Sequence, residues 1–208
     1  LVLLDGNTGT AKTDILHRLD ALGVQVLDLE GLANHRGSLL GEMDGGQPAQ
    51  KGFETALACA LARLDPTHPV IIEAESSKVG ERVVPPSLWA AMKAAPRIEI
   101  DAPLDARARY LANAYADVSA DTAGLTHKLE ILRRHRGSLV DGWLALLNAG
   151  EFEILARALM DEHYDPTYRS GRTRHGAEVL MRFDVQDLDV QARANLADRI
   201  AAWVASLS

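Results

Sequence analysis

The first thirteen residues combine the residue types that bind a phosphate group. Residues 2–13 contain an apolar run, a loop with two glycines, and Lys-Thr at the start of an amphipathic helix. A strand, a loop and a helix N-terminus in this order form a P-loop, whose backbone N–H groups converge on an anion. Lys12 adds a positive charge, for which we predict a catalytic role, and the Thr13 hydroxyl can ligate Mg²⁺. The predicted phosphate-binding residues of this loop are Gly6, Asn7, Thr8, Gly9, Thr10, Ala11, Lys12 and Thr13.

Position 11 departs from the P-loop pattern G-x-x-x-x-G-K-[ST]. Ala11 stands where the pattern has its last glycine, so a Cβ lies where the backbone should approach the phosphate closely. The alternative interpretation of the segment is a strand–turn–helix with two glycines and a solvated lysine.

A second polar segment follows the predicted strand Val24–Leu29 and contains His35, Arg36 and Ser38. Ligands of an open parallel sheet bind at the carboxyl ends of its strands, which places this segment beside the P-loop. Arg36 can hold a phosphate through two donors, and His35 can donate a proton near neutral pH. We predict catalytic roles for His35 and Arg36 and phosphate binding for Arg36 and Ser38. The alternative is a polar surface loop.

Two acidic residues follow the predicted strand Val70–Glu73. P-loop proteins place an acidic residue here to hold Mg²⁺ or its water. Glu73 and Glu75 are two residues apart and would share a face of a continuing strand. We therefore predict a metal site of Thr13, Glu73 and Glu75; the alternative is a carboxylate that caps a loop.

Arginines gather in three later segments. Arg107 and Arg109 follow the strand Arg97–Asp101, where they can close on a phosphate or form solvated charges on a helix. Two basic clusters are candidate surfaces for a polyanion, since a polyanion meets an acidic protein at local positive patches. Tyr164 and Tyr168 adjoin the second cluster and can stack on bases. The alternative for each cluster is a solvated face. The predicted polyanion-binding residues are Arg133, Arg134, Arg136, Tyr164, Tyr168, Arg169, Arg172 and Arg174.

Composition restricts the class of protein. The chain has 208 residues, a formal net charge of −7 and one cysteine, so it is neither a uniformly basic nucleic-acid binder nor a disulfide-stapled domain. We expect a cytoplasmic protein in which Cys59 is a buried core residue. No apolar run approaches the roughly 20 residues of a membrane span, so we expect no membrane partner. The chain starts at Leu1, inside a predicted strand, which suggests a fragment of a longer protein.

The order of the apolar runs predicts an α/β fold. Short strands that are apolar throughout alternate with amphipathic helices, as in a parallel sheet covered on both faces. We predict one P-loop NTPase-like domain over residues 1–208, with a helical insert at about 105–163. The predicted strands are Leu1–Leu4, Val24–Leu29, Val70–Glu73, Arg97–Asp101 and Glu178–Phe183. The predicted helices outside the insert are Thr13–Leu22, Phe53–Leu64, Ser87–Ala94 and Val190–Leu207.

The motifs together resemble the P-loop domain of the bacterial tRNA 2-selenouridine synthase family. The resemblance rests on G-N-T-G at 6–9, K-T at 12–13, D-L-E-G-L-A-N-H-R-G-S at 28–38, Q-P at 47–48, E-A-E-S at 73–76 with Gly80, and Y-D-P-T-Y at 164–168. It implies a two-part enzyme whose rhodanese domain carries the catalytic cysteine and is not in this chain. It also implies replacement of sulfur by selenium in wobble 2-thiouridine of tRNA, with selenophosphate as donor and an S-geranyl intermediate made from geranyl diphosphate.

Two other functions remain open from the sequence. A small-molecule or nucleotide kinase shares the P-loop and the later arginines, and a nucleotide-gated module would need no chemistry of its own. The ligand of the P-loop is therefore expected to be geranyl diphosphate, selenophosphate or a nucleotide, with Mg²⁺ as the candidate cofactor. The resemblance implies that the two basic clusters, with Tyr164 and Tyr168, bind tRNA. The clusters favour the tRNA-modifying enzyme, because a small-molecule kinase has no need of them.

Overall fold

The computed structural model describes residues 1–38, 40–115, 121–167 and 178–207. The candidate tRNA-binding residues Tyr168, Arg169, Arg172 and Arg174 lie outside this part of the chain.

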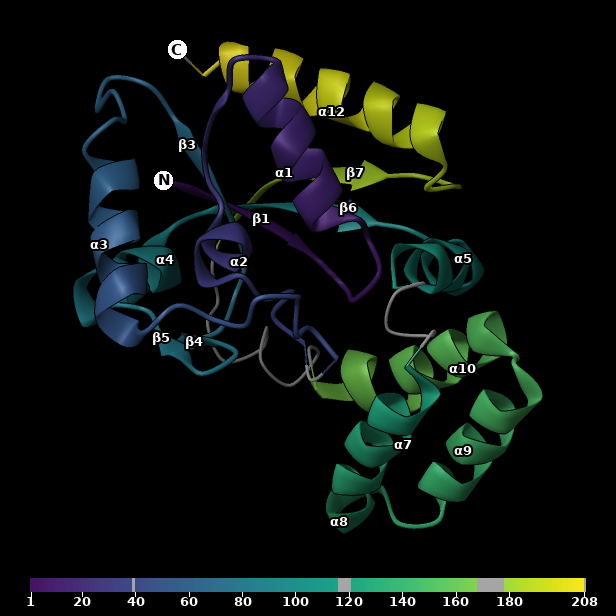
Figure 1. Ribbon diagram of the computed structural model, residues 1–208. Helices are drawn as coiled ribbons and strands as arrows, with labels where there is room; N and C mark the ends of the chain where they lie inside the picture. The colour runs from purple at the N-terminus through teal and green to yellow at the C-terminus, as the bar shows by residue number, and fades with distance from the viewer. Residues whose placement is uncertain (39, 116–120, 168–177, 208) are drawn as a thin grey trace.

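A five-stranded parallel sheet forms the centre of the fold, as predicted (Figure 1). Its order is β2-β3-β1-β6-β7, so the strand that leads into the P-loop lies in the middle. All five predicted strands are present, although the second is shorter than predicted because its last residues begin a helix. The strands are β1 (Val2–Gly6), β2 (Gln25–Leu27), β3 (Val70–Glu73), β6 (Arg97–Asp101) and β7 (Val179–Asp184).

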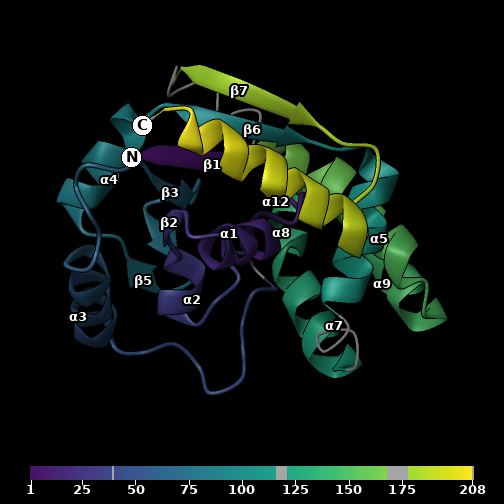
Figure 2. The ribbon, with the colours of Figure 1, turned by 90° about the horizontal axis from the view of Figure 1, so that it is seen from above.

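Helices cover both faces of the sheet because its strands are apolar on both sides. Ile71 and Ile72 are fully buried neighbours in β3 that point to opposite faces. Ile71 belongs to the core beneath α1 (Lys12–Ala21) and α12 (Val190–Ala205), which lie side by side in Figures 1 and 2. Ile72 belongs to the core beneath α3 (Gln50–Leu61) and α4 (Pro86–Ala94). The sheet is thus the middle of three layers.

Three local predictions from the sequence were incomplete or wrong. The segment after β2 is not simply a loop, because it begins with the short helix α2 (Leu29–Ala33). Asp28 caps this helix by accepting a hydrogen bond from the Gly31 N–H at 2.7 Å. A hairpin of β4 (Lys78–Val79) and β5 (Arg82–Val83) was also missed. Cys59 is exposed rather than buried, since α3 turns that side away from the sheet.

The described residues between β6 and β7 are largely helical and have a core of their own around the buried Trp143. In Figure 1 the later helices of this segment form the lower lobe of the molecule, and α5 lies between that lobe and the sheet. The helices are α5 (Leu104–Ala114), α7 (Thr122–Ile131), α8 (Arg133–Arg136), α9 (Leu139–Ala149) and α10 (Phe152–Leu159), followed by the π-helix η1 (Met160–Tyr164). Among the described helices, none combines the length and apolar character needed to cross a membrane.

Arg107 of α5 joins this lobe to the P-loop. Its guanidinium donates to both carboxylate oxygens of Asp165, at 3.0 and 2.8 Å, and to the backbone carbonyl of Thr8 at 3.0 Å. Arg107 and Asp165 are 5% and 6% exposed. Arg107 is therefore a structural residue rather than a lid over a phosphate. Arg109, by contrast, is exposed and pairs with Asp187.

Replacing one partner of this buried pair should destabilise the fold strongly. Asp165→Ala leaves the Arg107 guanidinium buried and uncompensated, and we expect a loss of about 3–5 kcal/mol in the free energy of unfolding, measured by urea denaturation. The control is Asp105→Ala, which breaks the exposed pair with Arg157 and should cost less than about 1 kcal/mol. Equal losses in the two variants would show that the buried pair contributes no more than a surface one.

Candidate functional site

A cavity of about 220 Å³ lies at the carboxyl end of β1, between the P-loop, the segment after α2, and α5. Thr8 to Thr13 line it, so the structure brings six of the eight predicted loop residues to one space, together with Arg36 and Ser38. Gly6 and Asn7 instead form the base of the loop. The Gly6 carbonyl accepts from Lys12 Nζ at 3.0 Å, and the Asn7 carbonyl accepts from the Thr10 hydroxyl at 2.8 Å.

The cavity offers the donors that an anion requires. Helix α1 begins at Lys12, so the N–H groups of its first turn lie at the cavity and carry the positive end of the helix dipole. The Lys12 ammonium bends back over the loop to the Gly6 carbonyl. The site therefore has the geometry of a phosphate-binding P-loop.

Ala11 adopts the backbone conformation that glycine usually supplies. It lies immediately before α1 with φ 60° and ψ 29°, and its side chain is 3% exposed. A left-handed conformation costs a residue with a Cβ about 1–2 kcal/mol. The loop thus keeps the P-loop shape at the expense of local strain.

Ala11→Gly should relieve that strain. We expect the free energy of unfolding to rise by about 0.5–1 kcal/mol, because the strain released exceeds the extra freedom of glycine in the unfolded chain. Phosphate affinity should be equal or tighter. The control is Ala58→Gly, on the exposed side of α3, which should cost about 1 kcal/mol. If urea titrations showed that both substitutions lower the free energy of unfolding, the packing of the Ala11 methyl group would stabilise the fold by more than the backbone strain destabilises it.

Three glutamates gather beside Thr13. The Thr13 hydroxyl donates to Glu30 Oε2 at 2.7 Å, and Glu30 also shares a hydrogen bond with Glu75. Glu73 lies deeper: its Oε1 accepts from the Glu30 backbone N–H at 2.8 Å. Burial, reinforced by the charge of Glu30, raises the pKa of Glu75 to about 8. Burial and the charge of Asp28 raise the pKa of Glu73. The cluster is thus rich in oxygen ligands, and Glu75 holds its proton at neutral pH.

This arrangement fits Mg²⁺ in part. Mg²⁺ binds to proteins through one or two carboxylates, while waters and phosphates complete its shell. Thr13, Glu30 and Glu75 line the cavity and would hold the ion, whereas Glu73 is absent from the lining and would support Glu30 from behind. In the described residues no group of three or more His, Cys, Asp or Glu side chains is arranged to bind a metal without other ligands. A bound ion would therefore depend on the phosphates of the ligand.

The proton on Glu75 should make stability depend on pH. The folded chain retains it up to pH about 8, whereas the unfolded chain releases it near 4.5. The free energy of unfolding should therefore fall as pH rises between these values, by at most about 1.4 kcal/mol per pH unit for one proton. Glu75→Gln should flatten this dependence and be relatively more stable at pH 8 than at pH 5. Urea titrations across this range check it, with the exposed Glu54→Gln as control. If the free energy of unfolding of Glu75→Gln depended on pH as that of the parent protein does, Glu75 would not be the group that holds the proton.

Arg36 lies where the sequence predicted it. Its guanidinium lies over the ring of Tyr115, 4.8 Å from the ring centroid, and the residue lines the cavity. Stacking on an aromatic ring fixes the plane of the guanidinium, which favours two-pronged binding of a phosphate. Ser38 is within 3.5 Å of the Tyr115 hydroxyl and borders the same cavity.

His35 does not line the P-loop cavity. It is 7% exposed, and its Nδ1 accepts from the Gly37 N–H at 3.1 Å, so it orders its own loop. It lines a neighbouring hollow with Gln47 and Glu81. Burial lowers the pKa of His35, which favours the neutral imidazole. Its catalytic role remains a prediction from the sequence, without a position at the P-loop to support it.

Most of the predicted tRNA-binding residues that the structure describes form contacts with other side chains. Arg133 pairs with Glu130 and Asp141, at 2.7 and 2.8 Å, and Arg136 donates to His163 Nδ1 at 2.9 Å. Arg134 is exposed. Tyr164 is half-buried and stands in the wall of an apolar groove rather than on an open surface. The structure therefore leaves Arg134 as the most accessible of the four.

Sequence reasoning missed two residues of the site. Glu30 directly follows the predicted strand Val24–Leu29 and was given no role, although its place two residues after Asp28 could have suggested a ligand. Tyr115 gave no signal, because it reaches the cavity from the end of α5, and only the fold shows that position.

Comparison with known proteins identifies similar chains. A family model described as the tRNA 2-selenouridine synthase AAA domain matches residues 1–131. The tRNA 2-selenouridine synthase of Aeromonas salmonicida is 38% identical over 207 residues, covering 99% of this chain and 49% of that protein. The protein of the same name from Shewanella loihica is 31% identical over 210 residues, covering 100% and 50%. That from Chromohalobacter salexigens is 33% identical over 195 residues, covering 81% and 52%. The chain thus spans about half the length of these relatives.

Proposed function

The chain belongs to the tRNA 2-selenouridine synthase family, and from that premise we propose that it is the phosphate-binding part of a tRNA-modifying transferase. In this proposal the enzyme converts 2-thiouridine at the wobble position of tRNA into 2-selenouridine. Selenophosphate supplies the selenium, and geranyl diphosphate forms an S-geranyl intermediate. The observation that carries the proposal is the convergence of Lys12, Thr13 and Arg36 on one cavity at the start of α1.

The residues suit the departure of a diphosphate. In the geranyl transfer, the sulfur of 2-thiouridine forms a bond to C1 of geranyl diphosphate while the C1–O bond breaks. The electron pair of that bond leaves with the diphosphate, and the base loses its N3 proton. Lys12, the N–H groups at the start of α1 and the Arg36 guanidinium would neutralise the charge that develops on the leaving oxygens. No hydrolysis of ATP is needed for this step.

Mg²⁺ bound at Thr13, Glu30 and Glu75 would add charge neutralisation on the diphosphate. Glu75 would have to lose its proton to bind the ion, so binding of ion and diphosphate would strengthen as pH rises. Glu73 would hold the backbone of Glu30 in place through the hydrogen bond already described.

The other partners belong to the same proposal. The tRNA backbone would meet the basic clusters, and a rhodanese domain of the same polypeptide would supply the catalytic cysteine. The half of the relatives' length that this chain does not cover leaves room for such a domain. A tRNA substrate agrees with a cytoplasmic location.

Substitution of Lys12 tests the proposal. In the intact protein, Lys12→Ala should weaken geranyl diphosphate binding by about 2–4 kcal/mol, roughly 30- to 1,000-fold, and abolish conversion of tRNA 2-thiouridine. Arg36→Lys keeps the charge but loses the planar fork, so it should impair activity nearly as much as Arg36→Ala. Calorimetry measures the affinity, and nucleoside chromatography of the tRNA measures the conversion.

Lys51→Ala is the matched control, because Lys51 is an exposed lysine of α3. This substitution should change neither the affinity for geranyl diphosphate nor the conversion of tRNA 2-thiouridine. Wild-type affinity and activity in Lys12→Ala would remove the P-loop from the reaction. Phosphorylation of a small molecule by ATP, with no effect of geranyl diphosphate, would favour the kinase instead.

A further inference from the structure

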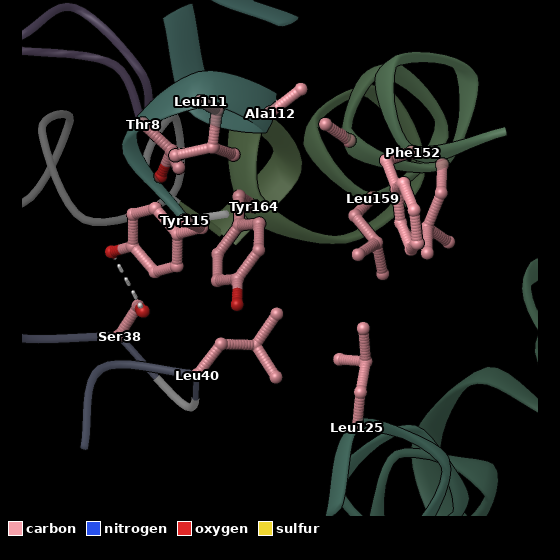
Figure 3. Close-up of a pocket in the computed structure, with 12 residues that line it drawn as sticks. Thr8, Ser38, Leu40, Leu111, Ala112, Tyr115, Leu125, Phe152, Leu159 and Tyr164 are labelled. Atoms are coloured by element: carbon pink, nitrogen blue, oxygen red, sulfur yellow. Dashed lines mark hydrogen bonds between the residues drawn. The ribbon is translucent and has the colours of Figure 1, made fainter. Parts of the chain in front are cut away.

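An apolar groove opens beside the P-loop cavity and has no part in the function proposed so far. Leucine, phenylalanine and tyrosine side chains line it from the loop after α2, from α5, α7, α10 and from η1. Figure 3 shows Leu40, Leu125 and Phe152 pointing into a common space, with Tyr115 and Tyr164 side by side at its edge. The twelve described residues that line the groove include no charged side chain. The groove therefore suits a hydrocarbon and offers little to a nucleoside or a sugar.

The groove and the P-loop cavity adjoin each other. Thr8, Ser38, Leu111 and Tyr115 line both. Tyr115 stands at the junction: its ring lies under the Arg36 guanidinium, and its hydroxyl faces Ser38 (Figure 3). A single molecule can therefore place an anionic group on the P-loop and an apolar group in the groove.

We infer that the groove holds the hydrocarbon chain of the phosphate ester whose phosphates occupy the P-loop cavity. This inference rests on the proposed function and adds to it the site that selects the chain. A charged head and an apolar tail on one ligand match the juxtaposition of the two spaces, and each buried methylene contributes roughly fourfold in affinity. A nucleotide would match only the P-loop half.

The dimensions of the groove favour a short chain. It offers about 50 Å³, room for roughly four water-sized groups at 10–15 Å³ each. Thr8 and Tyr115 stand at the P-loop end, whereas Phe152 and Leu125 stand at the far end (Figure 3). Phe152 at the start of α10 is half-buried, so it limits the length of the chain without being a central core residue. The terminal prenyl unit of a two-unit chain fits this space, and a third unit meets Phe152.

A series of diphosphate esters with the same charge tests the inference in the intact protein. The affinities of methyl, dimethylallyl, geranyl and farnesyl diphosphate are measured by calorimetry. We expect the affinity to rise at least tenfold from methyl to geranyl diphosphate and not to rise further with the farnesyl ester. Phe152→Ala should increase the affinity for farnesyl diphosphate at least fivefold. Ala112→Phe, which fills the groove from α5, should weaken geranyl binding at least tenfold and leave methyl diphosphate unchanged.

The matched control is Ala58→Phe on the exposed side of α3, which should change none of these affinities. Far-ultraviolet circular dichroism and unchanged methyl diphosphate binding show that Ala112→Phe is folded. Equal affinities of the parent protein for methyl and geranyl diphosphate, insensitive to Ala112→Phe, would overturn the groove as a chain site while the P-loop remains a diphosphate site. Failure of every ester to bind would overturn the proposed function, and the inference with it.

Discussion

The buried guanidinium of Arg107 is the contact on which the geometry of the site depends. It holds the Thr8 carbonyl of the P-loop from one side and the Asp165 carboxylate from the other. Gly9 also lies against α5 and η1, so closely that a Cβ there would be 3.0 Å from the Arg107 carbonyl oxygen. The loop between β1 and α1 and the helices α5 and η1 are therefore packed together as one unit.

Charge balance explains the composition of the cavity. Lys12 and Arg36 bring positive charge to the cavity lining, while Glu30 and Glu75 bring negative charge and share a hydrogen bond. Gly37, with φ 69°, lies over that pair, and a Cβ there would be 2.7 Å from a Glu30 carboxylate oxygen. A proton on Glu75 relieves the repulsion when no cation is present. A diphosphate with its metal ion would satisfy both halves at once, which accounts for acidic and basic side chains in so small a space.

The sequence predicted those parts of the molecule that depend on neighbours in the chain. The strands of the parallel sheet and the helix that follows the first strand were predicted from apolar runs and helical spacing, and the structure confirms them. Contacts between distant segments could not be predicted in this way. Tyr115 meets Arg36 across 79 positions, and Arg107 meets Asp165 across 58, because packing and not spacing brings them together. The prediction that Cys59 is buried was wrong for a related reason. An Ala/Leu-rich helix has an outer side as well as an inner one, and Cys59 lies on the outer side.

The helical lobe gives the P-loop its selectivity in this interpretation. A P-loop recognises phosphate through backbone N–H groups, which do not distinguish one phosphate ester from another. Discrimination must come from side chains that surround the rest of the ligand. Here those side chains are supplied by α5, α7 and α10, which lie between β6 and β7 and leave the sheet unchanged. Arg107, which holds the P-loop through the Thr8 carbonyl, belongs to α5, and α5 also lines the groove through Leu111 and Ala112. If the ligand binds as proposed, recognition of its head and of its tail would be coupled through the buried Arg107–Asp165 pair.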